Sequence, residues 1–249
     1  MSDAILVKDD GPIRTVRMNR AEKKNALTAD MYAAMANAIE GAEQNPEIRC
    51  VLIGGAPSVF CAGNDIGDFL KASASGGLAP EVLHFLHALA RCAKPLVAAV
   101  QGNAIGVGTT MLLHCDHVVA SEDARFATPF VGLGLVPEAA SSLIAPRLMG
   151  HARAFSLLVM GQPLSADAAK TAGLINTIAP ADQIEGEAMK AARHIAALPP
   201  QAMLAARHLM RGTRDEIAAR IDEEADAFKI RLQSPEAQAA FQTFMTRKR

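Results

Sequence analysis

The sequence predicts an α/β fold, and three observations support this prediction. Short apolar runs bounded by turn residues, such as Cys50–Gly54 and Leu96–Val100, are typical of buried strands. Segments with an apolar face at helical spacing follow such runs, so strands and helices alternate through the first three quarters of the chain. Half of the 249 residues are hydrophobic, which is enough for a sizeable core.

The N-terminal part is expected to form a hairpin, a helix and a buried strand. Residues 5–7 and 13–18 alternate as strands around the turn at residues 9–12. A polar loop runs to Leu27. Thr28 then suits the N-cap of a helix that extends to about Asn45.

The middle of the chain alternates strands with turns rich in small residues. Residues 58–66 follow the strand Cys50–Gly54, and residues 71–78, rich in Ser, Gly and Ala, are expected to form a mobile loop. Pro80 starts a helix to about Cys92. After the strand Leu96–Val100 we expect a glycine-spaced turn at 102–108, a helix at 109–114 and a strand at 117–120.

The C-terminal part is predicted to be mainly helical. A helix should open at Pro137-Glu138 and end at Gly150, followed by helices at 151–160 and from Ser165. Residues 175–179 form the last expected strand, and helices follow from about Asp182. This tail shows no core of its own, so it is expected to pack against the rest or against another subunit. Its apolar stripe consists of Ile217, Ile221, Phe228 and Leu232.

Composition argues against several classes of function. Lys plus Arg (25) balances Asp plus Glu (26), and there is no Trp and one Tyr, so neither nucleic acid nor a membrane surface is an expected partner. The N-terminus lacks a signal-peptide pattern, and the four cysteines lack metal or redox spacing. Reduced thiols and a cytoplasmic location are therefore expected. His84 and His87 share a helix face with no carboxylate or cysteine nearby in sequence, so no metal site is predicted.

Two turns are candidates for presenting backbone donors. Glycines around Val107, at a strand-to-helix turn, allow positive φ and close approach of a ligand, and the first N–H groups of a helix have no internal partners. The small residues around Asn64 suggest the same. A tight turn without a ligand is an equally open interpretation. The glycine spacing does not match a dinucleotide-binding motif.

Three charged residues have structural alternatives to a functional role. Glu138 could complement the dipole of the helix that it opens, and Asp65 could cap the helix that follows it. Lys24 could be a solvated surface residue. Taken alone, each of these positions favours the structural role.

The combination of motifs resembles the crotonase superfamily, the enoyl-CoA hydratases and isomerases, over essentially the whole chain. The matching segments are RAEKKNALT, FCAGNDI, PLVAAVQGNAIGVG and GLVPEAASSLIAPRLMG. The resemblance implies a spiral of ββα units in residues 1–195 and a helical C-terminal region in residues 196–249 that builds homotrimers or hexamers. It also implies an acyl-CoA thioester as the substrate, with coenzyme A as part of that substrate and no separate cofactor.

By motif position, the resemblance assigns the two backbone donors for the thioester oxygen to Asn64 and Val107. Two fixed N–H groups would stabilise the enolate formed by removal of a neighbouring proton. Val107 stands where a glycine is usual, and Asn64 where Ala is common. The residues that the resemblance assigns to CoA or substrate binding are Lys24, Ala26, Ala62, Asp65, Ile66, Gly106 and Phe130.

The reaction is predicted from three positions. Thr110 and Phe130 stand where hydratases carry their two glutamates, and neither can act as an acid or base near neutral pH. Glu138 matches the single catalytic glutamate of Δ3,Δ2-enoyl-CoA isomerases. An isomerase with Glu138 as proton shuttle is therefore the leading hypothesis. The alternatives are a hydratase with an atypical arrangement, another acyl-CoA reaction such as decarboxylation or thioester hydrolysis, and a non-catalytic acyl-CoA binder.

Overall fold

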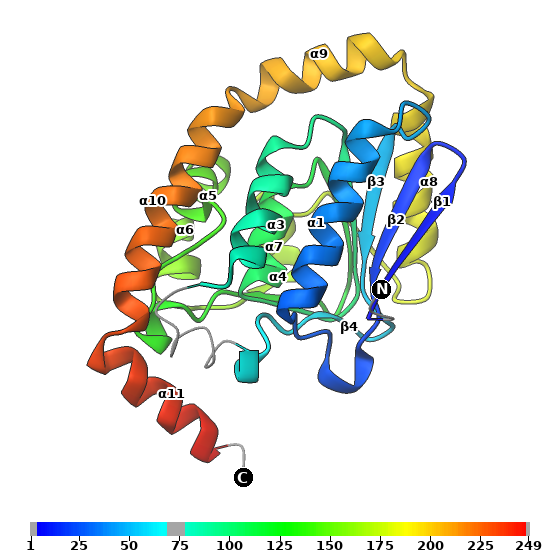
Figure 1. Cartoon of the computed structure of the whole chain (residues 1–249). Coiled ribbons are helices and arrows are strands. Elements are labelled where there is room, and N and C mark those ends of the chain that lie inside the picture. Colours follow the sequence, from blue (N-terminus) through cyan, green and yellow to red (C-terminus); the bar gives the residue numbers. More distant parts are fainter. Residues whose placement is uncertain (1–3, 69–77, 248–249) are drawn as a thin grey trace.

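The computed structural model describes residues 4–68 and 78–247, and it forms two β-sheets covered by helices (Figure 1). The strands are β1 (Ile5–Asp10), β2 (Ile13–Met18), β3 (Cys50–Gly54), β4 (Val59–Cys61), β5 (Leu96–Val100), β6 (Asn103–Ile105), β7 (His117–Ser121), β8 (Arg125–Ala127), β9 (Leu164–Ser165) and β10 (Thr177–Ala179). The longer helices are α1 (Ala29–Gln44), α3 (Pro80–Arg91), α5 (Ser141–Met149), α6 (His151–Leu158), α8 (Ile184–Ala197), α9 (Pro200–Arg211), α10 (Arg214–Leu232) and α11 (Pro235–Arg247). The short ones are η1 (Ala21–Lys23), α4 (Val107–Thr110), η2 (Met111–His114), η3 (Val131–Leu133) and α7 (Ala166–Thr171).

The two sheets are built by a chain that alternates between them. The larger sheet has the order β1-β2-β3-β5-β7-β10, and only β1 and β2 pair antiparallel. The smaller sheet has the order β4-β6-β8-β9. From β3 to β8, successive strands go to the larger and the smaller sheet in turn. This arrangement confirms the α/β class and the spiral of ββα units.

Both faces of the larger sheet are buried. The helices α1 and α3 lie side by side against one face, and α8 covers the other (Figure 1). Val51 and Ile53 therefore belong to the main core, whereas Cys50 and Leu52 pack toward α8. Parallel strands covered on both faces need continuous apolar runs, which explains why β3 and β5 were predictable.

Several expected elements have different bounds. The smaller sheet was not predicted, because its strands are two or three residues long and carry no clear alternation. The stretch expected to be one turn at 102–108 contains β6. The helix expected at 109–114 begins at Val107 and continues as a 3₁₀ helix. Residues 71–77 of the expected mobile loop lie outside the described residues.

The helix expected to open at Pro137-Glu138 begins instead at Ser141. Ala139 and Ala140 adopt left-handed conformations with φ of 62° and 54°, so the chain cannot be helical before Ser141. The interpretation of Glu138 as a first-turn residue of this helix is therefore wrong. Its carboxylate precedes the helix.

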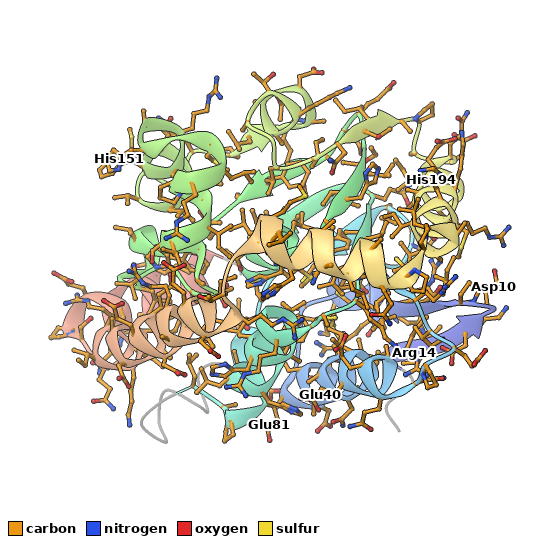
Figure 2. The ribbon with its side chains drawn as sticks, turned by 90° about the horizontal axis from the view of Figure 1, so that it is seen from above. Asp10, Arg14, Glu40, Glu81, His151 and His194 are labelled. Atoms are coloured by element: carbon orange, nitrogen blue, oxygen red, sulfur yellow. The ribbon has the colours of Figure 1, made fainter. Side chains whose placement is uncertain are left out.

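The C-terminal helices pack on the rest of the chain. In Figure 1, α9 crosses one end of the molecule, α10 runs down beside α3 and α5, and α11 reaches the far end. Phe228 of α10 and Phe241 of α11 form a cluster with Phe130 and Leu135. In the view from above, Asp10 and Glu40 lie at separate places on the molecular surface (Figure 2). The division into regions at residue 195 stays a prediction.

Candidate active site

The first donor turn, residues 62–65, is held by backbone pairing with the loop at residues 24–27. Ala62 N donates to Lys24 O at 3.0 Å, and Asp65 N donates to Leu27 O at 2.8 Å. Gly63 has φ of 89°, a conformation that favours glycine. Within the described ranges, the N–H of Asn64 has no acceptor.

The second donor turn joins β6 to α4. Gly106 adopts φ 56° and ψ −122°, which L-residues strongly disfavour, and its N–H donates to Ala127 O at 2.8 Å. Val107 then begins α4, and its N–H finds no acceptor in the part of the chain that the structure describes. This is the expected state of a first-turn N–H group.

The two donor turns adjoin each other. A Cβ on Gly63 would lie 3.1 Å from Ile105 O, and a Cβ on Gly106 would lie 4.0 Å from Gly63 Cα. The Val107 side chain is buried in the main core, so its replacement of a glycine adds no bulk to the pocket beside the turns. Two neighbouring N–H groups without internal acceptors can bind an oxygen that gains negative charge.

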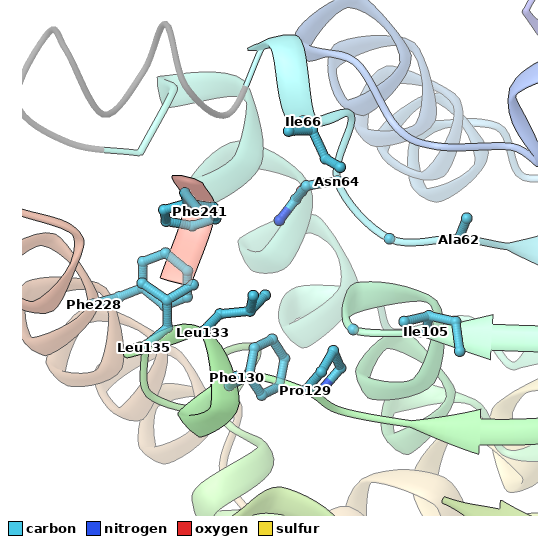
Figure 3. A pocket seen from close by; sticks show the side chains of 12 residues that line it. Ala62, Asn64, Ile66, Ile105, Pro129, Phe130, Leu133, Leu135, Phe228 and Phe241 are labelled. Carbon is cyan, nitrogen blue, oxygen red and sulfur yellow. The ribbon is translucent and has the colours of Figure 1, made fainter. Parts of the chain in front are cut away.

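A pocket of about 160 Å³ lies against both turns (Figure 3). Its wall is mainly apolar, and none of the described residues that line it has a titratable side chain. In Figure 3 the nitrogen of the Asn64 side chain points toward the side of the cavity formed by Leu133, Phe228 and Phe241. The Tyr32 hydroxyl donates to the other end of this amide, Asn64 Oδ1. The lining residues are Ala62, Gly63, Asn64, Ile66, Ile105, Gly106, Pro129, Phe130, Leu133, Leu135, Phe228 and Phe241.

The structure brings together some of the predicted site residues but not all of them. Five line the pocket, namely Ala62, Asn64, Ile66, Gly106 and Phe130. Lys24 is exposed and Ala26 is partly buried, and both lie in the loop that pairs with the first donor turn.

Asp65 has the structural role that its position suggested. Its Oδ1 accepts from the N–H groups of Gly67 (2.9 Å) and Asp68 (3.3 Å), which caps the helical turn that follows. Its Oδ2 accepts from Arg20 Nη1 at 2.8 Å. Burial raises the pKa of this carboxyl, but Arg20 and the two amides outweigh burial, so the net shift is downward.

Glu138 is buried beside the donor turns, with 6% of its surface exposed, and does not itself line the pocket. Thr110 Oγ1 donates to Glu138 Oε1 at 2.5 Å and lies 3.4 Å from the carbonyl oxygen of Gly106, a pocket residue. The Thr110 hydroxyl therefore connects the carboxylate to a residue of the pocket wall. When Glu138 is protonated, the Thr110 oxygen can accept a hydrogen bond from the carboxylic acid and donate its own hydrogen to Gly106 O instead.

Burial raises the pKa of Glu138 to about 7. The hydrogen bond from Thr110 opposes this shift, and the charge of Glu224 adds to it. The opposing effect of a helix start does not apply in the expected form, because α5 begins at Ser141. A carboxyl with this pKa can both accept and return a proton near neutral pH.

Sequence reasoning missed several residues around the site. Leu133, Phe228 and Phe241 line the pocket, and Tyr32 orients Asn64. The helical stripe that contains Phe228 indicated burial, but helical spacing does not say what such a stripe covers. Thr110 was considered only as the replacement for a glutamate, whereas it is the hydrogen-bond donor to Glu138.

Neither a metal site nor a membrane span emerges from the described residues. No group of three or more His, Cys, Asp or Glu side chains in residues 4–68 and 78–247 could hold a metal ion. No helix in these ranges is long and apolar enough to cross a bilayer. His84 and His87 pair instead with Glu40 at 2.9 Å and Asp222 at 2.8 Å.

Comparison with known proteins supports the resemblance. The model of the family described as enoyl-CoA hydratase/isomerase matches residues 9–249. "Enoyl-CoA delta isomerase 2" of Rattus norvegicus is 36% identical over 99% of this chain, which spans 64% of that protein. "Probable enoyl-CoA hydratase" of Rhizobium meliloti is 27% identical over 99% of this chain and 96% of its own length. The structure of Pseudomonas aeruginosa OdaA superposes with a TM-score of 0.93 at 43% identity, covering 98% of this chain and 99% of that one.

Proposed function

Because the chain belongs to the enoyl-CoA hydratase/isomerase family, we propose that it isomerises 3-enoyl-CoA thioesters to 2-enoyl-CoA thioesters. The observation that carries this proposal is the buried carboxyl of Glu138, which has a pKa of about 7 and lies beside a pocket whose described lining residues include no titratable side chain. The rat relative is named as an isomerase of this kind. Isomerisation consumes no water and needs only one acid–base group.

The proposed reaction moves one proton. The Glu138 carboxylate takes a proton from C2 of the 3-enoyl thioester, and the electron pair delocalises onto the thioester oxygen. The N–H groups of Asn64 and Val107 donate to that oxygen as its charge grows. Protonated Glu138 then returns the proton to C4, the double bond shifts to C2–C3, and the carboxylate is regenerated.

Thr110 would support both states of Glu138. It donates to the carboxylate before proton transfer and can accept from the carboxylic acid afterwards. Phe130 and Leu135, both 5% exposed, would keep the pocket dry around the acyl chain. Exclusion of water maintains the raised pKa of Glu138 and limits water addition to the product.

A hydratase is the second candidate, because the Rhizobium relative carries that name. Water addition by the usual route needs a second acid–base group, and the corresponding positions hold Thr110 and Phe130. The Thr110 hydroxyl is engaged with Glu138, and Phe130 is apolar. The geometry therefore favours isomerisation over hydration.

A paired assay tests the proposal. One preparation is given a 3-enoyl-CoA and separately crotonyl-CoA, and formation or loss of the conjugated thioester is followed. We expect isomerisation, and Glu138→Gln should lower its kcat by roughly 10²–10⁴-fold, the usual contribution of a general base. The control is Glu47→Gln, an exposed residue that does not line the pocket. Normal isomerisation by Glu138→Gln would refute the role of Glu138.

The other outcomes of the paired assay separate the alternatives. Appreciable hydration of crotonyl-CoA would favour the hydratase. Binding of CoA esters without turnover across a substrate panel would favour a non-catalytic acyl-CoA binder. With Glu138 as the base, kcat/KM should fall about tenfold for each pH unit below about 7, because protonation removes the base.

The CoA part of the substrate is proposed to lie along the loop at residues 24–27 and the first donor turn. Lys24 is exposed there, and its backbone carbonyl accepts from the N–H of Ala62, a residue that lines the pocket, so the lysine side chain starts from a loop next to the first donor turn. Lys24→Ala should raise KM for a CoA thioester but not for the matching pantetheine thioester, which lacks the nucleotide phosphates. Equal KM changes for both substrates would contradict this contact.

Four further expectations stay predictions. They are the homotrimer or hexamer, the cytoplasmic location, the lack of a cofactor apart from the CoA of the substrate, and the lack of a nucleic-acid partner. Light scattering would measure the assembly directly.

A further inference from the structure

Glu224 is a second buried carboxyl close to Glu138, and it comes from a different part of the chain. It lies on α10 and is 7% exposed. Its Oε2 accepts from Ala140 N at 2.6 Å, and its Oε1 accepts from Ser142 N at 2.9 Å. The two oxygens of this carboxylate thus bind two backbone N–H groups, those of Ala140 and Ser142, in the turn that follows Glu138.

This turn needs an external support. Ala139 and Ala140 both adopt left-handed conformations, which are uncommon for residues with a Cβ. The helix α5 then begins at Ser141 without any side-chain cap of its own. Glu224 supplies the missing acceptor from outside, at a helix start where a negative charge is favoured.

A second contact holds the other side of the turn. His114 Nε2 donates to Ala139 O at 2.8 Å, because a carbonyl oxygen can only accept. Burial lowers the pKa of this histidine to about 4, so it is neutral near pH 7. Arg220 Nη1 lies 3.3 Å from Ser142 Oγ and adds a positive charge on the α10 side. The segment after Glu138 is therefore fixed from two elements.

A negative charge on Glu224 raises the pKa of Glu138. The titratable groups that face Glu138 from α1 and β4 are Tyr32 and Cys61, and burial raises the pKa of each, to about 12 for Cys61. Both are neutral near pH 7. Burial also raises the pKa of Glu224, but Ser142, Ala140 and Arg220 favour its charged form.

We propose that Glu224 is a positioning residue for Glu138: it holds the left-handed turn from α10 and thereby keeps the Glu138 carboxylate against Thr110. The C-terminal helical region thus has a role in the proton transfer besides lining the pocket. This inference rests on the proposed function for its kinetic consequences, but its structural part can be measured without turnover.

Two variants of Glu224 distinguish the effect of its position from the effect of its charge. Glu224→Asp keeps the charge but shortens the side chain, so the turn should relax and kcat should fall by about 10- to 100-fold with little change in KM, since a misplacement of about 1 Å can cost that much. Glu224→Gln keeps the length but removes the charge, so the acid limb of the kcat/KM profile should move to lower pH. The matched control is Asp226→Asn, an exposed residue on the same helix, which should change neither quantity.

A measurement without substrate makes the test independent of the reaction. Carbon-13 NMR titration of the Glu138 carboxyl should show a lower midpoint in Glu224→Gln and an unchanged one in Glu224→Asp. The Ala140 amide should exchange with solvent faster in both. If wild-type protein does not isomerise, the proposed function falls while these shifts still support the positioning role.

The proposal is overturned if both Glu224 variants keep the wild-type kcat, titration midpoint and Ala140 exchange rate, as Asp226→Asn does. It is also overturned if both lose activity only in proportion to unfolded protein, measured by circular dichroism at the assay temperature. If Glu224→Gln does not fold, Glu224→Asp alone decides the outcome by its kcat and Ala140 exchange.

Discussion

The two donor turns present the same kind of group but are held in different ways. The first turn, around Asn64, is fixed by polar contacts, namely the partly exposed Arg20–Asp65 ion pair and the hydroxyl of the buried Tyr32. The second turn, around Val107, is fixed by packing, because Val107 and Gly108 are both buried. A Cβ on Gly108 would lie only 2.8 Å from Cys61 Cβ and Cys61 O.

This difference indicates how each turn should respond to change. A packed turn is sensitive to volume and insensitive to pH and salt, since it depends on close contact in the core. A turn held by ion pairs and hydrogen bonds tolerates small changes of volume but depends on charge and ionic strength. Substitutions in the two turns should therefore differ in size and in pH dependence.

The largest expected effect comes from Gly108→Ala in the second turn. The added methyl group would overlap the backbone and side chain of Cys61, so α4 must shift and carry the Val107 N–H with it. Overpacking of this kind costs about 1–3 kcal/mol of the free energy of unfolding. Urea denaturation and the isomerase assay should both show a loss that is the same at low and high salt.

Gly186→Ala is the matched control for this substitution. Gly186 lies in α8 with open space around its Cα, so an added methyl group meets nothing within 4 Å. Alanine should be neutral or stabilising there by up to about 1 kcal/mol, because it has a higher helix propensity. Equal stability of Gly108→Ala and Gly186→Ala would show that packing does not hold the second turn.

Tyr32→Phe should have an intermediate effect through the first turn. It keeps the buried ring but removes the hydroxyl that donates to Asn64 Oδ1. An acceptor left without its donor costs about 1–3 kcal/mol when it is buried, and Asn64 is only partly buried, so we expect about 1 kcal/mol and a modest loss of kcat/KM. In an Asn64→Ala background the same substitution should have no further effect on the first turn. A full additional loss there would mean that the hydroxyl acts elsewhere.

The sequence allowed the fold to be predicted where patterns were long or local. The strands β3 and β5 are continuous apolar runs, and both donor turns carry small residues at the point where a strand ends. The short strands of the smaller sheet were not predictable, because two or three residues show no periodicity.

The candidate site was predictable only in part. The motif positions directed attention to Asn64, Val107 and Glu138, and the structure places all three near one pocket. The contributions of Phe228 and Glu224 depend on how α10 docks, a long-range contact that no local pattern contains. Glu138 was expected to open a helix because Pro137 precedes it. The left-handed turn after it is stabilised by groups remote in sequence, so the local rule failed.

The smallest expected effect, and the one most dependent on pH, comes from Asp65→Asn in the first turn. The pKa of Asp65 is lowered from 3.8 in the folded protein, because Arg20 and two backbone N–H groups outweigh the effect of burial. A lowered folded-state pKa means that the unfolded chain binds protons first as the pH falls. The stability that this charge contributes is therefore complete above about pH 4 and disappears as the pH falls through the folded-state pKa. An ion pair of this exposure plus a cap is worth about 1 kcal/mol, and Asn keeps part of the cap.

The measurement is the urea midpoint of Asp65→Asn and of wild type at pH 7, 5, 4 and 3. The difference between the two midpoints should persist down to about pH 4 and then shrink. The control Asp182→Asn, at an exposed position, should show no difference from wild type. A difference that stays constant with pH would mean that the shape of the carboxyl, and not its charge, holds the first turn. The first turn would then not be held by charge, and both turns would depend on the shape of the groups that pack around them.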